Sequence, residues 1–245
     1  IYEGITATKI RSGIEVTNGD ISIFQVTADA LQSTFDLDAK LLRHQPSTPQ
    51  LTINASATEL DIATLLKTLD RSSKPSAAPL MTGTLNLANN WQMAGSSVGD
   101  WQASLTGNSK ASIQNGRFYA DNIEHRICQA IAEIRQTKLR HAWPSFTALK
   151  ASDLAIDWRQ GHGKITDFTA DLETLKIAGS GTIDLSTLQF LLDVNGQVIG
   201  TYHTSINDHL SDPACAVNAK YQTIQWPVSC QGRLNLSLIH ISEPT

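Results

Sequence analysis

The sequence predicts a mainly β protein (β-rich α+β), in which an extended antiparallel sheet carries two amphipathic helices. Apolar residues recur at every second position over most of the chain, which is the period of a strand with one apolar and one polar face. Short turns separate these runs. Such turns join antiparallel strands, because a parallel crossover needs about a dozen residues or more. Two segments change to the helical period and supply the helices.

Residues 1–79 are expected to form strands followed by the first helix. Alternating runs cover residues 21–30, 35–41 and 51–57. The sequence Asn18-Gly19-Asp20 ahead of them is a turn signal.

The first helix is predicted over residues 61–69, with Asp61 as its N-cap. Four apolar residues share one face of this helix: Ile62, Leu65, Leu66 and Leu69. The stretch 71–79 is rich in Ser, Pro and Ala and is the best linker candidate. It separates residues 1–79 from a second β-rich part, residues 80–235.

This second part is expected to contain the second helix. Residues 80–87 read as a strand and residues 110–119 as a strand broken by an Asn115-Gly116 turn. The stretch between them is poorly defined, with Trp91 and Trp101 as possible anchors. Asp121 is predicted to begin the helix, with Glu124 as its capping-box partner. The predicted buried stripe is Ile123, Ile127, Ala130, Ile131 and Ile134. The basic end of the helix, which suits the helix dipole, is Arg135, Lys138 and Arg140.

The most regular alternation, between residues 164 and 194, supplies the candidate functional site. The candidate lining residues are Leu175, Ile177, Gly179, Gly181, Ile183, Leu185, Leu188, Phe190, Leu192 and Val194. Their apolar face has two interpretations. One is a closed sandwich core, which the sequence alone favours, and the other is an open groove that holds acyl chains. In a groove each buried CH₂ contributes about 0.8 kcal/mol, and the small Gly179 and Gly181 would leave room for the ligand.

Composition and motifs argue against several other functions. Nineteen basic and twenty-three acidic residues give a net charge of −4, and the basic residues are scattered, so nucleic acid is not an expected partner. The sequence has no nucleophile elbow and no phosphate-binding loop. His203, Asp208 and His209 lack the spacing of metal ligands on a helix. We therefore expect no catalytic residues, no metal and no cofactor, and a protein that is not an enzyme.

Several segments resemble the AsmA family of envelope proteins. Residues 60–69 followed by 81–87 are similar to the family's helix ahead of a GTLNL strand. Residues 112–123 resemble its Asn-Gly turn that leads into a helix. Residues 165–185 resemble its strands around a GSGTIDL sequence, and residues 226–232 also fit. Together these segments span most of the chain and resemble the C-terminal region of the family.

The resemblance implies a protein anchored in the bacterial inner membrane by an N-terminal segment that lies outside this chain, with its bulk facing the periplasm. It implies a groove- or taco-like sheet that handles or transports phospholipid or another envelope lipid between inner and outer membrane. Such a protein supports outer-membrane assembly, with a possible partner at the outer membrane. The alternative is a structural scaffold that influences outer-membrane protein assembly without binding lipid.

The periplasm that the resemblance implies is an oxidising compartment, in which cysteines can form disulfides. Cys215 and Cys230 lie fifteen residues apart and are predicted to form a disulfide. In the entropic account a loop of this size would stabilise the fold by about 3 kcal/mol. Cys128 lies on the apolar side of the second predicted helix and is expected to be a buried free thiol.

The two ends of the chain suggest a piece of a longer protein. The chain opens on Ile1 rather than Met, and residues 236–245 read LSLIHISEPT. This stretch matches, codon by codon, the translation of a sequencing-library transposon adapter. We therefore expect that it is not native, and that the natural protein continues beyond residue 235 and before residue 1.

Overall fold

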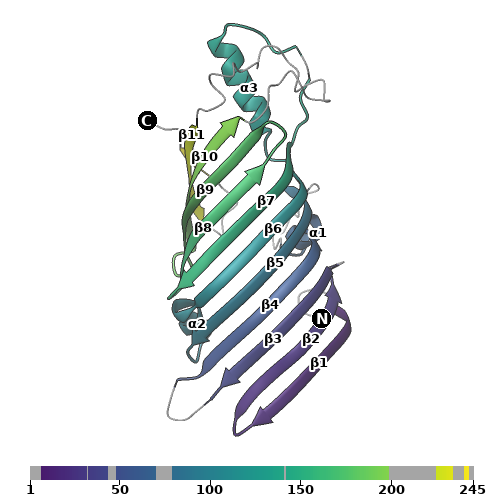
Figure 1. Cartoon of the computed structure of the whole chain (residues 1–245), viewed down its shortest axis with the longest axis vertical. Coiled ribbons are helices and arrows are strands. Elements are labelled where there is room, and N and C mark those ends of the chain that lie inside the picture. The colour runs from purple at the N-terminus through teal and green to yellow at the C-terminus, as the bar shows by residue number, and fades with distance from the viewer. Residues whose placement is uncertain are drawn as a thin grey trace.

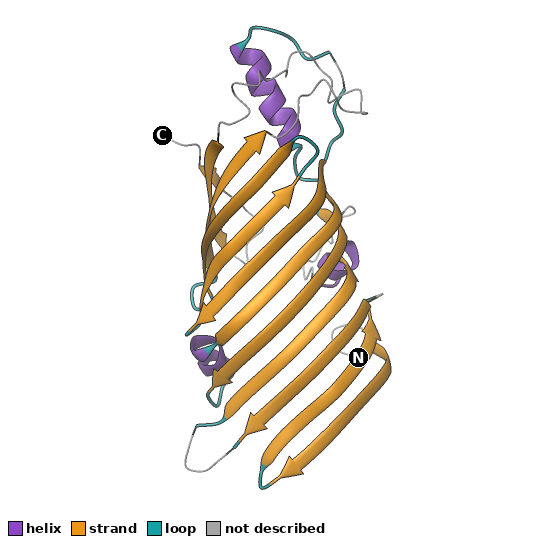
Figure 2. Ribbon diagram, viewed as in Figure 1, coloured by secondary structure: helices purple, strands orange, loops and turns teal. Residues whose placement is uncertain are grey.

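The computed structural model describes residues 7–31, 33–43, 48–69, 79–140, 142–198, 225–233 and 240–242. Its strands form one antiparallel sheet, in which each strand pairs with its neighbours in sequence from β1 to β12. The strands lie side by side and inclined to the long axis of the molecule, with β1 at one end (Figure 1). Figure 2 shows that strands make up most of the secondary structure. The predicted fold class is confirmed.

Apart from the short last strand, the strands are between 9 and 14 residues long. They are β1 (Ala7–Thr17), β2 (Asp20–Ala30), β3 (Ser33–Leu42), β4 (Gln50–Asp61), β5 (Met81–Ala94), β6 (Thr106–Phe118), β7 (Thr147–Arg159), β8 (His162–Asp171), β9 (Leu175–Asp184), β10 (Gln189–Val198), β11 (Gln225–Arg233) and β12 (His240–Ser242). β4 and β5 flank the predicted linker and pair along their length, so one sheet runs through both predicted parts.

Two hairpins are closed by two-residue turns whose residues have positive φ. Asn18 and Gly19 join β1 to β2 with φ of 52° and 88°, as the turn signal predicts. Gln160 and Gly161 join β7 to β8 with φ of 50° and 76°. Turns of this kind match the twist of the flanking strands, and glycine adopts positive φ without steric cost. This second turn thus occupies residues 160 and 161, and Gly163 lies in β8. The break predicted at Asn115-Gly116 was wrong, because β6 continues through both residues.

The helix α1 (Ile62–Leu69) forms as predicted. The Thr64 N–H donates to Asp61 Oδ2 at 2.8 Å, which confirms Asp61 as the N-terminal cap. The helix packs against β5 and β4, and Ile62 is buried.

A short helix that the sequence reading missed, α2 (Val98–Ser104), lies in the stretch that looked undefined. Its cap is a capping box: Asp100 N–H donates to Ser97 Oγ at 3.2 Å, and Ser97 N–H donates to Asp100 Oδ2 at 3.1 Å. The Asp100 carboxylate also accepts from the Ser96 N–H at 3.1 Å. This bond, followed by those from Ser97, lowers the pKa of Asp100. Trp101 anchors the segment, as expected, by donating from Nε1 to the Gly95 carbonyl at 3.0 Å.

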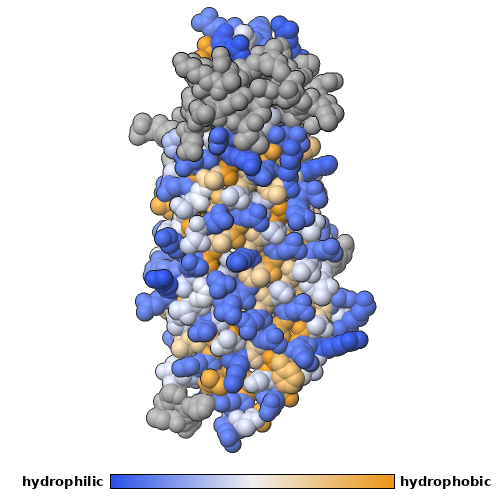
Figure 3. Space-filling view, in the orientation of Figure 1, coloured by the Kyte–Doolittle hydropathy of each residue, from blue (hydrophilic) through white to orange (hydrophobic). Residues whose placement is uncertain are grey.

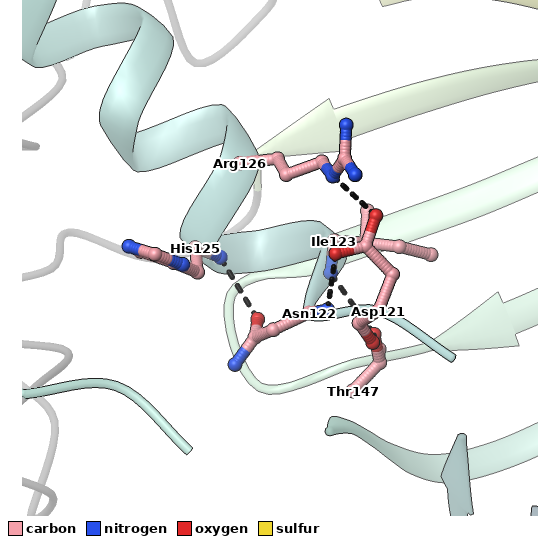
Figure 4. A network of polar contacts seen from close by, with 6 residues as sticks. All are labelled: Asp121, Asn122, Ile123, His125, Arg126 and Thr147. Atoms are coloured by element: carbon pink, nitrogen blue, oxygen red, sulfur yellow. Dashed lines mark hydrogen bonds and ion pairs between the residues drawn. The ribbon is translucent and has the colours of Figure 1, made fainter. Parts of the chain in front are cut away.

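The helix α3 (Ile123–Ile134) is present, but its predicted cap was wrong. Asn122 caps it, accepting from the His125 N–H at 2.8 Å through Oδ1 (Figure 4). Thr147 Oγ1 accepts from the Ile123 N–H at 3.0 Å and donates to the Asp121 carbonyl at 2.7 Å. The Asp121 carboxylate pairs with Arg126 instead of capping the helix.

The predicted buried stripe of α3 is also partly wrong. The buried residues are Glu124, Cys128 and Ala132, which are spaced at i, i+4 and i+8 on one helix face. Ile134 is 83% exposed. The sequence pattern places only apolar residues on the buried face, whereas Glu124 is buried because it accepts hydrogen bonds from Thr174.

Most of the buried apolar residues that the structure describes lie in two clusters. The end cluster comprises Cys128, Ala170, Leu172 and Leu175, and joins α3 to β8 and β9. The central cluster comprises Leu105, Ile156, Trp158 and Ile165, with Trp91 and Met93 packed against it. The core is thus a layer on one face of the sheet, and α3 covers one end of it.

Part of the predicted non-native tail also forms a strand, since β12 pairs with Ser229–Gln231 of β11. The open edge of a sheet accepts any extended segment through its unpaired backbone groups. This pairing therefore leaves the origin of residues 236–245 untested.

Candidate functional site

The candidate lining residues on β9 and β10 share one face of the sheet. The register places Ile183 opposite Phe190, Gly181 opposite Leu192, and Gly179 opposite Val194. Along β9, residues 177, 179, 181 and 183 are half-buried, whereas residues 176, 178, 180 and 182 are exposed. The predicted alternation of an apolar and a polar face is confirmed here. That the apolar face binds a ligand stays a prediction.

Three of the ten candidates differ from the expected strand lining. Leu185 and Leu188 lie in the turn between β9 and β10. Leu188 has a φ of 54°, and Leu185 packs against the central cluster. Leu175 is 3% exposed and belongs to the end cluster under α3. Ile177, the next residue on the same face, is half-buried and packs against the same cluster.

The apolar face continues far beyond β9 and β10, as two rows of residues that run across the strands. The first row, in strand order from β1 to β10, is Ile14, Ile23, Ala39, Ile53, Trp91, Gly107, Trp158, Gly163, Ile183 and Phe190. The second row, from β2 to β10, is Ala28, Phe35, Ala57, Leu87, Ala111, Leu154, Phe168, Gly179 and Val194. Neither row contains a polar side chain.

The rows are long on the scale of a lipid. Neighbouring strands lie about 4.8 Å apart, so the first row extends for roughly 43 Å. Half the hydrocarbon core of a bilayer is roughly 15 Å thick. Each row is therefore longer than the acyl chain of one leaflet.

A polar pair lies between the two rows in the middle of the sheet. Ser109 Oγ accepts from Trp91 Nε1 at 3.0 Å and from Trp158 Nε1 at 2.9 Å. A buried indole needs a partner for its N–H, and here one hydroxyl serves two rings from different strands. The second member of the polar pair is Asn89, which lies opposite Ser109 on β5. Sequence reasoning missed this arrangement, because the three residues are distant in the chain.

The apolar face differs at its two ends. At the α3 end, Ile123, Ile127 and Trp143 pack against the end cluster and cover it. At the β1 end, Ile14 and Val16 are each 66% exposed. Among the described residues, then, the face is covered beneath α3 and exposed at β1.

The polar face also has a hollow, of about 1240 Å³, over β7 to β11. The charged side chains around it are Asp157, Arg159, Lys164, Asp184, Asp193 and Arg233. Ile183, Phe190 and Leu191 also line the hollow, so it combines balanced charges with apolar surface. Figure 3 shows one face of the sheet, on which hydrophilic side chains predominate and hydrophobic surface appears in patches between them.

The structure gives Gly179 and Gly181 a role other than the predicted one of leaving room for a ligand. A Cβ at Gly181 would lie 2.1 Å from the Leu191 carbonyl oxygen, and one at Gly179 would lie 2.4 Å from the Asp193 carbonyl oxygen. The Val194 side chain also occupies the space over Gly179, 2.7 Å from such a Cβ. These glycines let β9 and β10 approach closely, so the room expected for a ligand at Gly179 is already filled by protein.

One buried ionisable group stands out. Glu124 is 4% exposed, and its Oε1 accepts from the Thr174 N–H at 2.7 Å and from the Thr174 hydroxyl at 2.6 Å. Burial raises its pKa, an effect that the Thr174 hydrogen bonds oppose. This contact joins α3 to the turn between β8 and β9 and so helps to hold the helix against the sheet.

Metal and membrane-spanning features were sought in the same part of the chain. No three or more His, Cys, Asp or Glu side chains of the described residues come together as a metal site. None of the described helices has the length and apolar character needed to cross a membrane. His203, Asp208 and His209 lie outside the described residues.

The prediction of a free thiol at Cys128 needs correction. Cys128 is fully buried, as expected, but it is disulfide-bonded rather than free. The predicted Cys215–Cys230 disulfide lies outside what the structure describes, since Cys215 and the side chain of Cys230 are not among the described parts of the chain.

Comparison with known proteins adds no relative. No protein-family model matches the chain, and neither a curated protein nor a solved structure shows significant similarity to it.

Proposed function

We propose that this chain is a non-enzymatic, periplasm-facing segment of an AsmA-like envelope protein, and that its apolar sheet face handles lipid acyl chains. In this proposal the protein is anchored in the inner membrane outside this chain, moves lipid between inner and outer membrane, and supports outer-membrane assembly. The resemblance of several sequence segments to that family supports the proposal.

The observation that carries the proposal is the pair of unbroken apolar rows across the sheet. A hydrocarbon chain has no polar group to satisfy, so a continuous apolar line is sufficient to hold it. Ten CH₂ groups moved from water onto such a row would contribute about 8 kcal/mol before the cost of ordering the chain. Because the first row crosses the strands from β1 to β10 and the second those from β2 to β10, a lipid could move along either row without meeting a polar side chain.

A scaffold function is the second candidate, and one observation favours it. Ile183, Leu185 and Leu192 pack against the central cluster, so protein side chains already cover part of the apolar face. A scaffold would use the sheet as a rigid spacer and would influence outer-membrane protein assembly through partners.

Lipid that co-purifies with the chain distinguishes the two candidates. We expect mass spectrometry of gently purified protein to find phospholipid bound to it. Ile183→Asn should reduce the bound lipid several-fold, because it places an amide in the first row. Thr182→Asn is the matched control, since it changes the adjacent residue on the exposed face. A folded wild-type chain that carries no lipid would favour the scaffold.

A further inference from the structure

The outer end of α3 differs in character from the rest of the molecule. In Figure 1 α3 runs away from the strand ends, and the chain turns back at its far end. Ile134, the last residue of the helix, is 83% exposed. Arg135, Lys138 and Arg140 follow within six residues and are all exposed. We call Ile134, Arg135, Lys138 and Arg140 the α3 tip.

The charge of this region is opposite to that of the whole chain. Residues 133–140 contain three basic residues and one acidic residue, Glu133, whereas the chain as a whole carries a net charge of −4. Figure 3 shows hydrophilic atoms gathered at this end of the molecule, with a hydrophobic patch among them. An anionic surface would attract the tip and repel the rest, so it would orient the molecule with α3 foremost.

The helix dipole explains only part of this arrangement. Basic residues near the C-terminus of a helix are stabilising because they face its negative pole, but the effect fades beyond the last turn. Lys138 and Arg140 lie beyond the helix. The dipole also gives no reason for a large apolar side chain to be almost fully exposed at the same place.

We propose that the α3 tip docks on an anionic lipid bilayer surface. Exposed apolar side chains beside Lys and Arg are the combination that binds the membrane interface: the apolar group enters the headgroup region and the cations meet anionic headgroups. Docking there would bring the covered end of the apolar face to the membrane, because the end cluster lies directly beneath α3. The inference goes beyond the proposed function, since the tip can bind a membrane whether or not the sheet holds lipid.

Vesicle co-sedimentation of the full 245-residue chain tests the proposal. The chain should bind vesicles of phosphatidylcholine mixed with phosphatidylglycerol, bind pure phosphatidylcholine far more weakly, and lose affinity as salt is added. Lys138→Gln should weaken binding about fivefold, the contribution of one basic residue near an anionic membrane. Ile134→Ser should weaken it about tenfold, because a buried apolar side chain is lost.

Lys110→Gln is the control, because it removes the same charge from an exposed position in the middle of β6. It should bind like the wild-type chain. Both tip residues are exposed, so their variants should keep the wild-type circular dichroism spectrum. Equal binding to neutral vesicles, equal losses for Lys110→Gln and Lys138→Gln, or no vesicle binding at all would overturn the proposal. Co-purified lipid reports on the apolar face separately and should be unchanged in the tip variants.

Discussion

Gly181 and Gly196 lie on neighbouring strands of the same sheet and tolerate a side chain very differently. An added Cβ at Gly181 would lie 2.1 Å from the Leu191 carbonyl oxygen, a backbone atom that cannot move aside. At Gly196, among the side chains that the structure describes, it would meet Leu175 Cδ1 at 3.6 Å, which is an ordinary contact. The alternation in sequence predicts that residues 179 and 181 face the apolar side, but it does not show which glycines the neighbouring strand requires.

We predict that Gly181→Ala lowers the free energy of unfolding by about 1–3 kcal/mol, because β9 and β10 must move apart to admit the methyl group. Gly196→Ala should leave stability unchanged or raise it by up to about 1 kcal/mol, since alanine loses less backbone entropy on folding. Urea denaturation of both variants measures the difference. Equal destabilisation by the two substitutions would contradict the close approach of β9 and β10 at Gly181.

At the scale of elements, the sequence predicts which helices exist better than it predicts how they dock. The first helix and its Asp61 cap are confirmed, since both depend on neighbours in the chain. α2 was missed because seven residues are too few to show a helical period, although Ser97 and Asp100 formed a recognisable capping box. At α3 the predicted box was wrong, because Glu124 is bonded to Thr174, fifty residues away.

The Glu124 contact predicts how the docking of α3 depends on pH. Burial raises the pKa of Glu124 above its ordinary value of 4.5, with Glu173 adding to the rise and Lys150 and the Thr174 hydrogen bonds opposing it. A raised pKa in the folded state means that the protonated acid is favoured there. Its stabilising contribution is therefore complete below pH 4.5 and is lost as the pH rises through the raised pKa.

Glu124→Gln replaces the acid with a neutral group of the same shape and should remove this loss. We expect the free energy of unfolding of the variant, relative to wild type, to increase as the pH rises from 4.5 towards neutrality. Glu133→Gln, on the exposed side of the same helix, is the control and should show a smaller dependence. A difference between Glu124→Gln and wild type that stays constant over this range would contradict the assignment.

At the scale of the whole molecule, the sequence predicts the order of the strands and the face that each presents. Short turns and period-two alternation are local properties, and the sheet follows them from β1 to β10. The sequence alone favoured a closed sandwich, whereas the described strands form one sheet. Alternation shows that a face is apolar, but what covers that face depends on segments far away in the chain, such as α3 over Leu175.

The continuity of the two rows was equally hidden from the sequence. It depends on register, and a slip of one residue in any pair of strands would move apolar side chains to the opposite face. Bulges interrupt several pairs, among them β4 with β5 and β8 with β9. The rows nevertheless stay in line across them.

The most direct test of the account is site-specific photocrosslinking in living cells. A photoreactive residue in place of Ile183 or Phe190, which face each other in the first row, should capture phospholipid. The same residue at Thr182, on the exposed face of β9, should capture little or none. Lipid captured from Thr182 and not from Ile183 or Phe190 would show that the apolar face does not hold acyl chains.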